Sequence, residues 1–381
     1  MNVPKLRFQE FNGNWEEKML KDTGDFLGGG TPNTKNLDSW NGLIPWISSS
    51  DLTDESIYCI RKTRFITEEA ITNSATKLIP KNSILIVSRV GVGKVAVSDC
   101  ALCTSQDFTN LVPFTDNSIF LAYFIKIKTH FLLGFNQGTS IKGFVKSDLE
   151  TLRLCLPSLN EQTKMASFFS SVDDKLSQLK KKKSLLEQYK KGVMQKIFSQ
   201  ELRFKDEDGN DFADWEEKKI GSICKITTGK LDANAMVENG EYRFYTCAKN
   251  YYQINKYAFD TEALLISGNG ANVGYIHHYK GKFNAYQRTY VLDGFKENII
   301  FIKYFLQQYL STRINEEKKE GNTPYIVLSA LSEMIVFIPT STEQSKIANF
   351  FSVIDDKINQ CGMQIEKMEL WKKGLLQQMF V

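Results

Sequence analysis

Two stretches of the chain share one spacing of apolar side chains. In residues 156–199 and again in 338–381, apolar residues recur at alternating steps of three and four positions. This heptad period is typical of a helix that packs against a second helix along a narrow seam. The seam positions are Met165, Phe169, Val172, Leu176, Leu179, Leu186, Val193 and Ile197 in the first stretch, and Ile347, Phe351, Ile354, Ile358, Cys361, Ile365, Met368, Leu375 and Met379 in the second. The pattern predicts two long helices.

The two helical stretches are copies of one another. They align without a gap, and several short motifs recur at one constant offset. The motif pairs are Glu161-Gln162 with Glu343-Gln344, Phe168-Phe169 with Phe350-Phe351, Asp173-Asp174-Lys175 with Asp355-Asp356-Lys357, and Lys190-Lys191-Gly192 with Lys372-Lys373-Gly374. Self-similarity of this kind indicates an internal duplication.

A second repeated motif marks where each half begins. Leu6-Arg7-Phe8 followed by Trp15-Glu16-Glu17-Lys18 recurs as Leu202-Arg203-Phe204 followed by Trp215-Glu216-Glu217-Lys218. Between these motifs and the helices, the two halves differ strongly. We therefore predict a variable domain (1–155), a helix (156–199), a second variable domain (200–337) and a second helix (338–381).

Local signals place the start of each helix. Pro157 and Pro339 are expected to end the preceding strand, and Asn160 or Thr342 to cap the first helical turn. A rod of about 38 residues is about 57 Å long, and a lone rod would expose its seam. Since the duplication supplies a partner, we expect the two helices to pack as an antiparallel coiled coil.

Lysines interrupt both seams. They lie at Lys183 and Lys190 in the first helix and at Lys372 in the second. A charged side chain at a seam position weakens apolar packing. We therefore expect the coil to be looser at Lys183.

The variable domains have the pattern of mixed α/β units. Short β-rich runs are separated by Gly, Asn, Asp and Ser, and residues 83–88 and 263–267 are typical of buried strands. Residues 119–131 and 299–310 have the spacing of amphipathic helices at matching places. The predicted fold class is α+β, with two mixed α/β domains joined by two long helices in an internal pseudo-two-fold repeat.

Glycine-rich loops follow both buried strands. Residues 89–94 lack the Ser or Thr that closes a P-loop, and after residues 268–274 a strand resumes where a dinucleotide fold requires a helix. We interpret both loops as hairpin turns. Because they recur at equivalent positions, they are also candidates for contact with a nucleic-acid backbone through Arg89 and Lys94.

Composition narrows the class of protein. The hydrophobic fraction of 42% and the charged fraction of 24% are ordinary for a globular protein. There is no run of about 18 apolar residues that would predict a membrane span, and the first residues lack the apolar core of a signal peptide. Seven scattered cysteines favour a reducing compartment. We therefore expect a cytoplasmic protein without membrane contact.

One short motif raises the alternative of an enzyme. Asn322-Thr323-Pro324-Tyr325 is close to the Asn-Pro-Pro-Tyr of adenine methyltransferases, but the first proline is missing and no cofactor-binding glycine loop precedes it. We interpret it as a turn. The chain also lacks the signatures of zinc peptidases, serine hydrolases and kinases. We therefore expect no catalytic, cofactor-binding or metal-binding residues.

With these motifs, the chain resembles the specificity subunits of type I restriction-modification systems. The resemblance covers nearly the full length, and the duplicated helix motifs are its most specific part. The first half also has Gly29-Gly30-Thr31-Pro32 followed by Gly42-Leu43-Ile44-Pro45-Trp46, which is frequent in this family. The second half differs, with Thr228-Gly229-Lys230-Leu231 in its place.

The resemblance implies a non-catalytic chain that recognises DNA. Each variable domain would be a target-recognition domain for one half of a split site in double-stranded DNA. The helices would fix the spacing and dock two modification subunits. The seam residues assigned to this packing and docking are Phe169, Val172, Leu176, Leu179, Phe351, Ile354, Ile358 and Ile365. S-adenosylmethionine, ATP and Mg would be bound by the modification and restriction subunits, and no cofactor by this chain.

A rigid rod between two dissimilar domains converts helix length into base-pair spacing. Since duplex DNA rises about 3.4 Å per base pair, a rod of about 57 Å caps the separation near 17 base pairs. Divergent domains on repeated helices are expected if the DNA target varies while the partner stays the same.

DNA bases and phosphates are contacted chiefly by Arg, Lys, Asn and Gln, which we expect on loops. Our candidates are Arg89, Lys94, Lys142 and Lys146 in the first domain, and Arg243, Lys249, Asn269, Asn272 and Arg288 in the second. Gln106 and Gln287 occupy matching positions, which indicates a shared structural or backbone-contact role.

Three alternatives stay open from the sequence. One is an adenine methyltransferase built around residues 322–325, and another is a coiled-coil interaction protein that never touches DNA. The latter would lack the basic face that a DNA-binding protein needs on both domains. The third is the specificity chain of a related system in which methylation and cleavage share one partner polypeptide.

Overall fold

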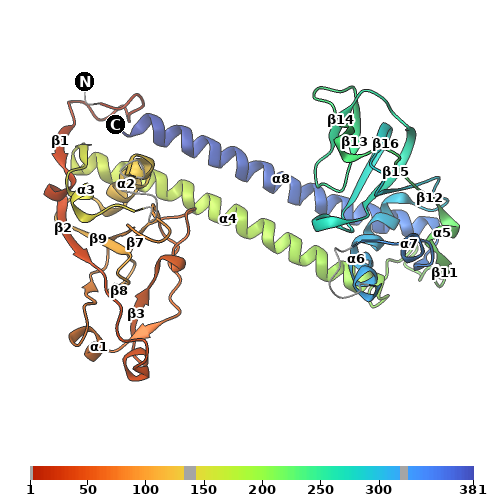
Figure 1. Cartoon of the computed structure of the whole chain (residues 1–381). Helices are drawn as coiled ribbons and strands as arrows, with labels where there is room; N and C mark the ends of the chain where they lie inside the picture. The colour runs from red at the N-terminus through yellow and green to blue at the C-terminus, as the bar shows by residue number, and fades with distance from the viewer. Residues whose placement is uncertain (1–2, 133–142, 318–324) are drawn as a thin grey trace. The chain divides into compact units, whose positions relative to one another are not determined.

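The computed structural model describes residues 3–132, 143–317 and 325–381. It divides into two compact units, Met1–Lys180 with Met363–Val381, and Lys181–Gly362. Two long helices, α4 (Leu159–Phe198) and α8 (Ser341–Met379), each pass from one unit into the other (Figure 1). Each unit therefore contains part of both helices.

The first unit is mixed α/β. Its further elements are β1 (Glu16–Met19), β2 (Gly24–Gly28), β3 (Ile44–Ile47), β4 (Phe65–Ile66), α1 (Glu68–Thr72), β5 (Leu78–Ile79), β6 (Ile84–Val87), β7 (Val95–Val97), β8 (Leu102–Thr104), β9 (Phe108–Pro113), α2 (Ser118–Leu132), α3 (Lys146–Glu150) and β10 (Arg153–Leu156). They form a four-stranded sheet in the order β2-β9-β6-β7, another in the order β4-β3-β8-β5, and the pair β1-β10.

The second unit repeats this plan. Its further elements are β11 (Glu216–Lys219), α5 (Ile220–Ile223), β12 (Lys225–Thr228), β13 (Tyr242–Tyr245), β14 (Tyr252–Ile254), β15 (Phe259–Ser267), β16 (Ile276–Ala285), β17 (Thr289–Asp293), α6 (Ile299–Glu317), α7 (Leu328–Ser332) and β18 (Ile335–Ile338). One six-stranded sheet has the order β12-β17-β15-β16-β13-β14, and β11 pairs with β18.

The two units share one strand topology. The order β12-β17-β15-β16 matches β2-β9-β6-β7, and in each unit one strand pair is parallel, β3 with β8 and β13 with β16. The long β16 takes the place of both β7 and β8, so the second unit has one sheet where the first has two. The predicted α+β class and the repeat are confirmed, and β6, β15, α2 and α6 lie where the sequence predicted them.

The heptad seam is confirmed in each unit. In the first, Phe169, Val172, Leu176 and Leu179 are buried on α4, and α4 runs antiparallel to α8, because Lys180 Nζ lies 2.8 Å from Glu369 Oε1 while Asp173 pairs with Lys372. In the second, Phe351 and Ile354 are buried. Ile358 is partly buried there, and Ile365, which belongs to the first unit, is also partly buried.

The helices begin slightly earlier than the sequence indicated. Pro157 and Pro339 do end the preceding strands, but the caps predicted at Asn160 and Thr342 are wrong, since both residues lie inside the first turn. The hydroxyl of Ser158 accepts a hydrogen bond from Glu161 N at 3.4 Å, and Thr340 does the same for Glu343. A single residue, Ser158 or Thr340, separates each proline from the start of its helix, and that residue is the cap.

The repeated Leu-Arg-Phe motif docks onto the start of a helix. Arg7 donates to both carboxylate oxygens of Glu161, each at 2.7 Å, and Arg203 donates to both oxygens of Glu343 at 3.2 and 2.8 Å. Both glutamates are at most 1% exposed. The ion pair raises the pKa of each arginine, through its hydrogen bonds to the carboxylate. Two motifs that are far apart in each half therefore form one buried pair.

Removal of these arginines should destabilise the two units unequally. Trp215 Nε1 also donates to Glu343, at 3.1 Å, whereas Trp15 Nε1 is buried without a partner among the described residues. We expect Arg7→Ala to lower the free energy of unfolding by about 1–2 kcal/mol more than Arg203→Ala, because Glu343 keeps one buried donor. Urea unfolding of the two variants measures the difference, and equal losses would contradict it.

Two of the three lysines that interrupt the seam pair with an aspartate of the other helix copy. Lys372 pairs with Asp173, and Lys190 Nζ lies 2.6 Å from Asp355 Oδ1. Tyrosines complete both pairs, since Tyr123 donates to Asp173 at 2.5 Å and Tyr304 to Asp355 at 2.8 Å. Each pair thus joins the Lys-Lys-Gly motif of one helix copy to the Asp-Asp-Lys motif of the other.

Candidate nucleic-acid interface

Loops from four parts of the sequence converge at one edge of the first unit. We call this group loop cluster 1; it comprises residues 29–31, 48–52, 88–94 and 105–107. Main-chain hydrogen bonds hold the loops together, from Gly30 N to Thr104 O at 2.8 Å, from Ser105 N to Ile47 O at 2.8 Å and from Arg89 N to Asp107 O at 3.3 Å. The edge is therefore a preformed surface of loop backbone.

The second unit assembles an equivalent group. Loop cluster 2 comprises residues 229–231, 246–250, 268–275 and 286–288. Gln287 N donates to Leu231 O at 2.9 Å, Tyr286 N to Tyr245 O at 2.9 Å and Gly268 N to Arg288 O at 2.8 Å. The same four connections thus meet in both units, although their sequences differ. Both glycine-rich loops belong to these clusters and connect antiparallel strands, as predicted.

A glycine allows the closest approach in each cluster. A Cβ on Gly29 would lie 2.0 Å from Ser105 O, and one on Gly229 would lie 1.8 Å from Ala285 O. Both distances are shorter than any real contact, so only glycine fits. The second half therefore keeps this one feature of the Gly-Gly-Thr-Pro stretch that its sequence otherwise lacks.

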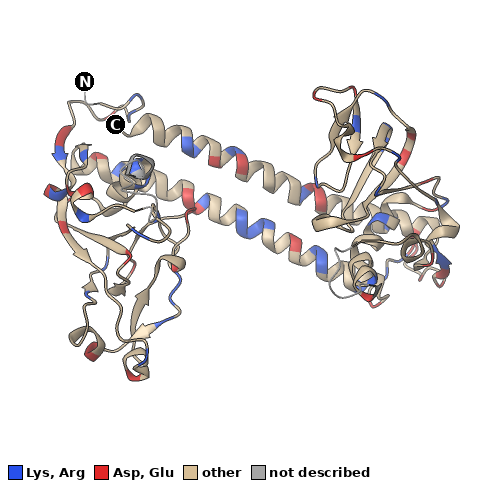
Figure 2. Ribbon diagram, viewed as in Figure 1, with Lys and Arg blue, Asp and Glu red and all other residues tan. Residues whose placement is uncertain are grey.

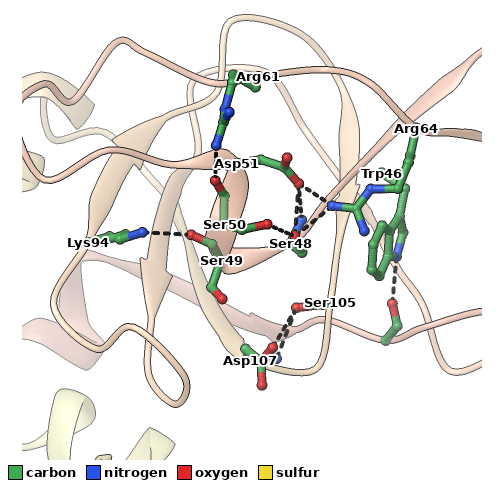
Figure 3. Close-up of polar contacts among 11 residues, drawn as sticks. Trp46, Ser48, Ser49, Ser50, Asp51, Arg61, Arg64, Lys94, Ser105 and Asp107 are labelled. Carbon is green, nitrogen blue, oxygen red and sulfur yellow. Dashed lines mark hydrogen bonds and ion pairs between the residues drawn. The ribbon is translucent and has the colours of Figure 1, made fainter. Parts of the chain in front are cut away.

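Side chains of the hairpins hold the segment that follows β3 or β13. Lys94 Nζ donates to Ser49 O at 3.1 Å (Figure 3). It also donates to Leu52 O at 3.0 Å. In the second unit, Asn272 Nδ2 donates to Cys247 O at 3.0 Å. His277 Nε2 lies 2.9 Å from Ala248 O. The main chain of residues 48–52 and that of residues 246–250 are thus each held by hydrogen bonds from side chains of the same domain.

A second network fixes the same segment in the first unit. The buried carboxylate of Asp51 accepts hydrogen bonds from Ser48 N at 2.8 Å and from the Arg64 guanidinium (Figure 3). Arg64 also stacks on Trp46, with 4.6 Å between its Cζ and the ring centre. Trp46 Nε1 donates to Gly30 O at 2.8 Å. Sequence reasoning missed this network because its members come from separate loops.

The predicted contacts of the first domain have different surroundings. Arg89 is exposed within loop cluster 1. The ammonium of Lys94 is used inside the domain, and Lys146 forms an ion pair with Glu150 at 3.3 Å on α3. Lys142 lies outside the described residues. DNA contact by these residues stays a prediction; Arg89 and Lys146 are exposed, and Lys94 is partly buried.

The candidates of the second domain fall into two groups. Lys249 and Arg288 are exposed in loop cluster 2, and Asn269 is half-buried there. Asn272 holds the main chain of residue 247, as described above. Arg243 lies on β13 with its Cζ 4.3 and 4.5 Å from the ring centres of Tyr251 and Tyr279, and a hydrogen bond to Tyr245 raises its pKa. These assignments also stay predictions.

The matching glutamines connect loops within each cluster. Gln106 accepts a hydrogen bond from Thr31, and Gln287 Nε2 donates to Asp232 Oδ1 at 2.8 Å. Each bond ties the loop before the last sheet strand to the loop after the first one. This is a structural role of the kind that their matching positions indicated.

The clusters differ in charge. Loop cluster 2 contains Lys230, Lys249 and Arg288 and no acidic residue. The charged residues of loop cluster 1 are Arg89, Lys94, Asp51 and Asp107. Basic residues occur in both units (Figure 2), but the positive character of the loop edge is much stronger in the second.

His277 should make the stability of the second unit depend on pH. Burial lowers the pKa of its imidazole below the ordinary value of about 6.5. As the pH falls below about 6.5, the unfolded chain takes up a proton that the folded chain binds less readily, so stability declines. The expected slope is at most about 1.4 kcal/mol per pH unit, and His277→Gln should flatten it in urea unfolding between pH 7 and 5. An unchanged slope would exclude His277 as its source.

Several alternatives can be compared with the described residues. Asn322, Thr323 and Pro324 of the motif close to that of adenine methyltransferases lie outside them, while Tyr325 is exposed and its backbone forms a bridge with Asn269. Within the described part of the chain, no group of three or more His, Cys, Asp or Glu could hold a metal ion. Of the helices described, none has the length and apolar character to cross a membrane.

Comparison with known sequence families decides the classification. The sequence model described as "Type I restriction modification DNA specificity domain" matches residues 12–188 and 213–367. The chain belongs to this family. The two matches cover both halves of the duplication, so each half is one copy of the family domain.

Relatives of this family match the chain at full length or over one half. The specificity subunit of the type I restriction enzyme MjaIX from Methanocaldococcus jannaschii is 29% identical, over 95% of this chain and 91% of the relative. The specificity subunit of the type I restriction enzyme EcoDI from Escherichia coli is 37% identical over 41% of this chain and 34% of the relative.

Solved structures show the same fold. The S subunit of a type I restriction-modification system from M. genitalium has a TM-score of 0.69 and 19% identity, with coverage of 100% of this chain and 99% of that one. A chain from a structure on complex assembly and conformational transition of the type I R-M system has a TM-score of 0.56 and 14% identity, with coverage of 95% and 96%.

Proposed function

We propose that this chain is the DNA specificity subunit of a type I restriction-modification complex, and that each unit recognises one half of a split site in double-stranded DNA. One observation carries the proposal. The two units build the same loop cluster on the same strand topology but present different side chains on it. A protein that contacts two different half-sites with equivalent surfaces requires this combination.

The exposed flank of the coil supports docking of two modification subunits. The seam residues are buried or partly buried within the units, so a further protein has to bind beside them. Trp371 is 49% exposed in the first unit, and Tyr189 at the equivalent repeat position is 53% exposed in the second. Phe168 lies 6.0 Å from Trp371, ring centre to ring centre. Two equivalent aromatic surfaces fit two copies of one partner.

Catalysis is assigned to the partner subunits. We propose that S-adenosylmethionine binds to the modification subunits, that ATP serves the restriction subunits, that Mg is bound by partner subunits, and that this chain contributes recognition alone. The lengths of α4 and α8 would then set the number of base pairs between the half-sites. The compartment is proposed to be the cytoplasm, where the complex meets DNA.

Methylation mapping tests the proposal. The chain is co-expressed with the modification gene adjacent to its own gene, and methylated adenines in the host genome are sequenced. A split motif with two half-sites is expected, and exchange of residues 1–155 for another variable domain should change one half-site alone. Unmodified DNA from an assembled, active complex would overturn the proposal, as would methylation by the purified chain without a partner.

A further inference from the structure

We infer that base recognition in each half-site is carried by the segment that follows the parallel strand, residues 48–52 after β3 and residues 246–250 after β13. This inference rests on the proposed function, and it names the specificity-determining residues within each domain. The sequence prediction already included Lys249 among its candidates, but it named neither Asn250 nor any of residues 48–52.

The main chain of residues 246–250 is held in place. Asn272 donates to the carbonyl of Cys247, the imidazole of His277 contacts the carbonyl of Ala248, and Cys247 Sγ lies 3.4 Å from Arg288 O. A rigid backbone keeps the next side chains in one geometry, which discriminating contacts need. The glycine-rich hairpin therefore supports the main chain of this segment through the side chain of Asn272.

The next two side chains of the segment are free to bind. Lys249 and Asn250 are exposed, and neither has a side-chain hydrogen bond or ion pair to another described residue. Both line a groove of about 870 Å³ together with Tyr251 and Tyr252. Lys249 and Asn250 thus combine a fixed backbone with polar side-chain groups that have no hydrogen-bond partner among the described residues.

Their chemistry matches purine edges in the major groove. The amide of an asparagine forms paired hydrogen bonds with N6 and N7 of adenine, and lysine donates to O6 and N7 of guanine. Arg288 and Lys230 in the same loop cluster supply positive charge for the neighbouring phosphates. We therefore assign Asn250 to an adenine and Lys249 to a guanine of the second half-site.

The equivalent segment of the first unit is also held by hydrogen bonds but carries serines. The Ser48 hydroxyl is bonded to Asp51 and Arg64, whereas Ser50 is exposed, with its hydroxyl 2.9 Å from that of Ser48. Lys94 holds the carbonyl of Ser49, the Asp51 carboxylate holds Ser48, and Arg61 Nη2 donates to Ser50 O at 2.5 Å. A serine hydroxyl both donates and accepts, so it pairs with more than one base. The two segments have equivalent positions in the fold but carry different residues. This explains how the two units recognise different half-sites without a change of fold.

The test is a base-by-base binding profile of the intact complex. After the wild-type motif is mapped, the complex with the modification subunits is assayed on duplexes that carry each single-base change in both half-sites. For Asn250→Ala and for Lys249→Ala, we expect discrimination at one position of the second half-site to fall by about 5- to 150-fold, with the first half-site unaffected. Lys256→Ala removes the same charge from an exposed position outside loop cluster 2 and should change no preference.

Each outcome has a definite meaning. Weaker binding to all duplexes with an unchanged order of preference would overturn the inference, and so would an unchanged profile, while the proposed function would stand. Asn250→Ser keeps a small polar side chain and covers the case in which the alanine variant does not assemble. Absence of a split motif for the wild-type complex would instead overturn the proposed function itself.

Discussion

Replacement of Lys372 by methionine is expected to lower the free energy of unfolding of the first unit by about 3–5 kcal/mol. The ammonium is paired with Asp173, whose side chain is 8% exposed, and lies 5.2 Å from the ring centre of Tyr123. Methionine keeps most of the side-chain volume, but the carboxylate is left buried with the Tyr123 hydroxyl as its remaining described donor. Urea unfolding of the full chain measures the loss.

Matched variants separate the charge from the packing. Lys190→Met should cost less, about 1–3 kcal/mol, because Asp355 is 27% exposed and water replaces part of the lost interaction. The double variant Asp173→Asn with Lys372→Met removes both charges and should recover most of the loss. If Lys372→Met alone left the unfolding curve unchanged, the pair would contribute nothing to stability.

The second large effect is expected from alanine at the two cluster glycines. In Gly29→Ala the new Cβ meets Ser105 O at 2.0 Å, and in Gly229→Ala it meets Ala285 O at 1.8 Å. The loops have to separate, at a cost of about 1–3 kcal/mol, which displaces the recognition segment beside them. We expect Gly29→Ala to impair recognition of the first half-site alone and Gly229→Ala that of the second alone, by about 5- to 150-fold in binding.

Gly28 supplies the control for this experiment. It precedes Gly29 directly, and a Cβ there would meet no atom within 4 Å. Gly28→Ala should therefore leave both half-sites and the stability of the chain nearly unchanged. An equal effect of the Gly28 and Gly29 variants in the duplex-binding assay would show that loop separation is not the cause.

The coil could be predicted from the sequence because its signal is local. Heptad spacing fixes which side of a helix is apolar, and Phe169 and Phe351 are buried as that spacing requires. The sequence could not give the partners of Lys190 and Lys372, because an ion pair across an antiparallel coil depends on the register between two distant segments. Lys190 and Lys372 interrupt the apolar pattern along the sequence, but in the folded chain each forms an ion pair with an aspartate of the other helix copy.

The loop clusters were only partly predictable, because some of their contacts also depend on segments that are distant in the sequence. The hairpins after β6 and β15 follow from glycine and strand patterns, so their equivalence was visible. Residues 48–52 reach loop cluster 1, and residues 246–250 reach loop cluster 2, because the strand before each segment pairs in parallel with a distant strand. Such pairing leaves no short-range pattern in the sequence. One signal was present: Gly29 and Gly229 are related by the same offset as Trp15 and Trp215.

The discontinuity of the first unit has a consequence for biosynthesis. The second unit is one continuous stretch, so it has all of its residues once residue 362 has left the ribosome. The first unit is begun earlier but lacks residues 363–381, among them Phe380, whose ring lies 5.1 Å from that of Phe120. Until those residues emerge, an apolar surface on the nascent first unit is open, and chaperones or premature contacts act there. The domain that is translated first is the one that folds to completion last.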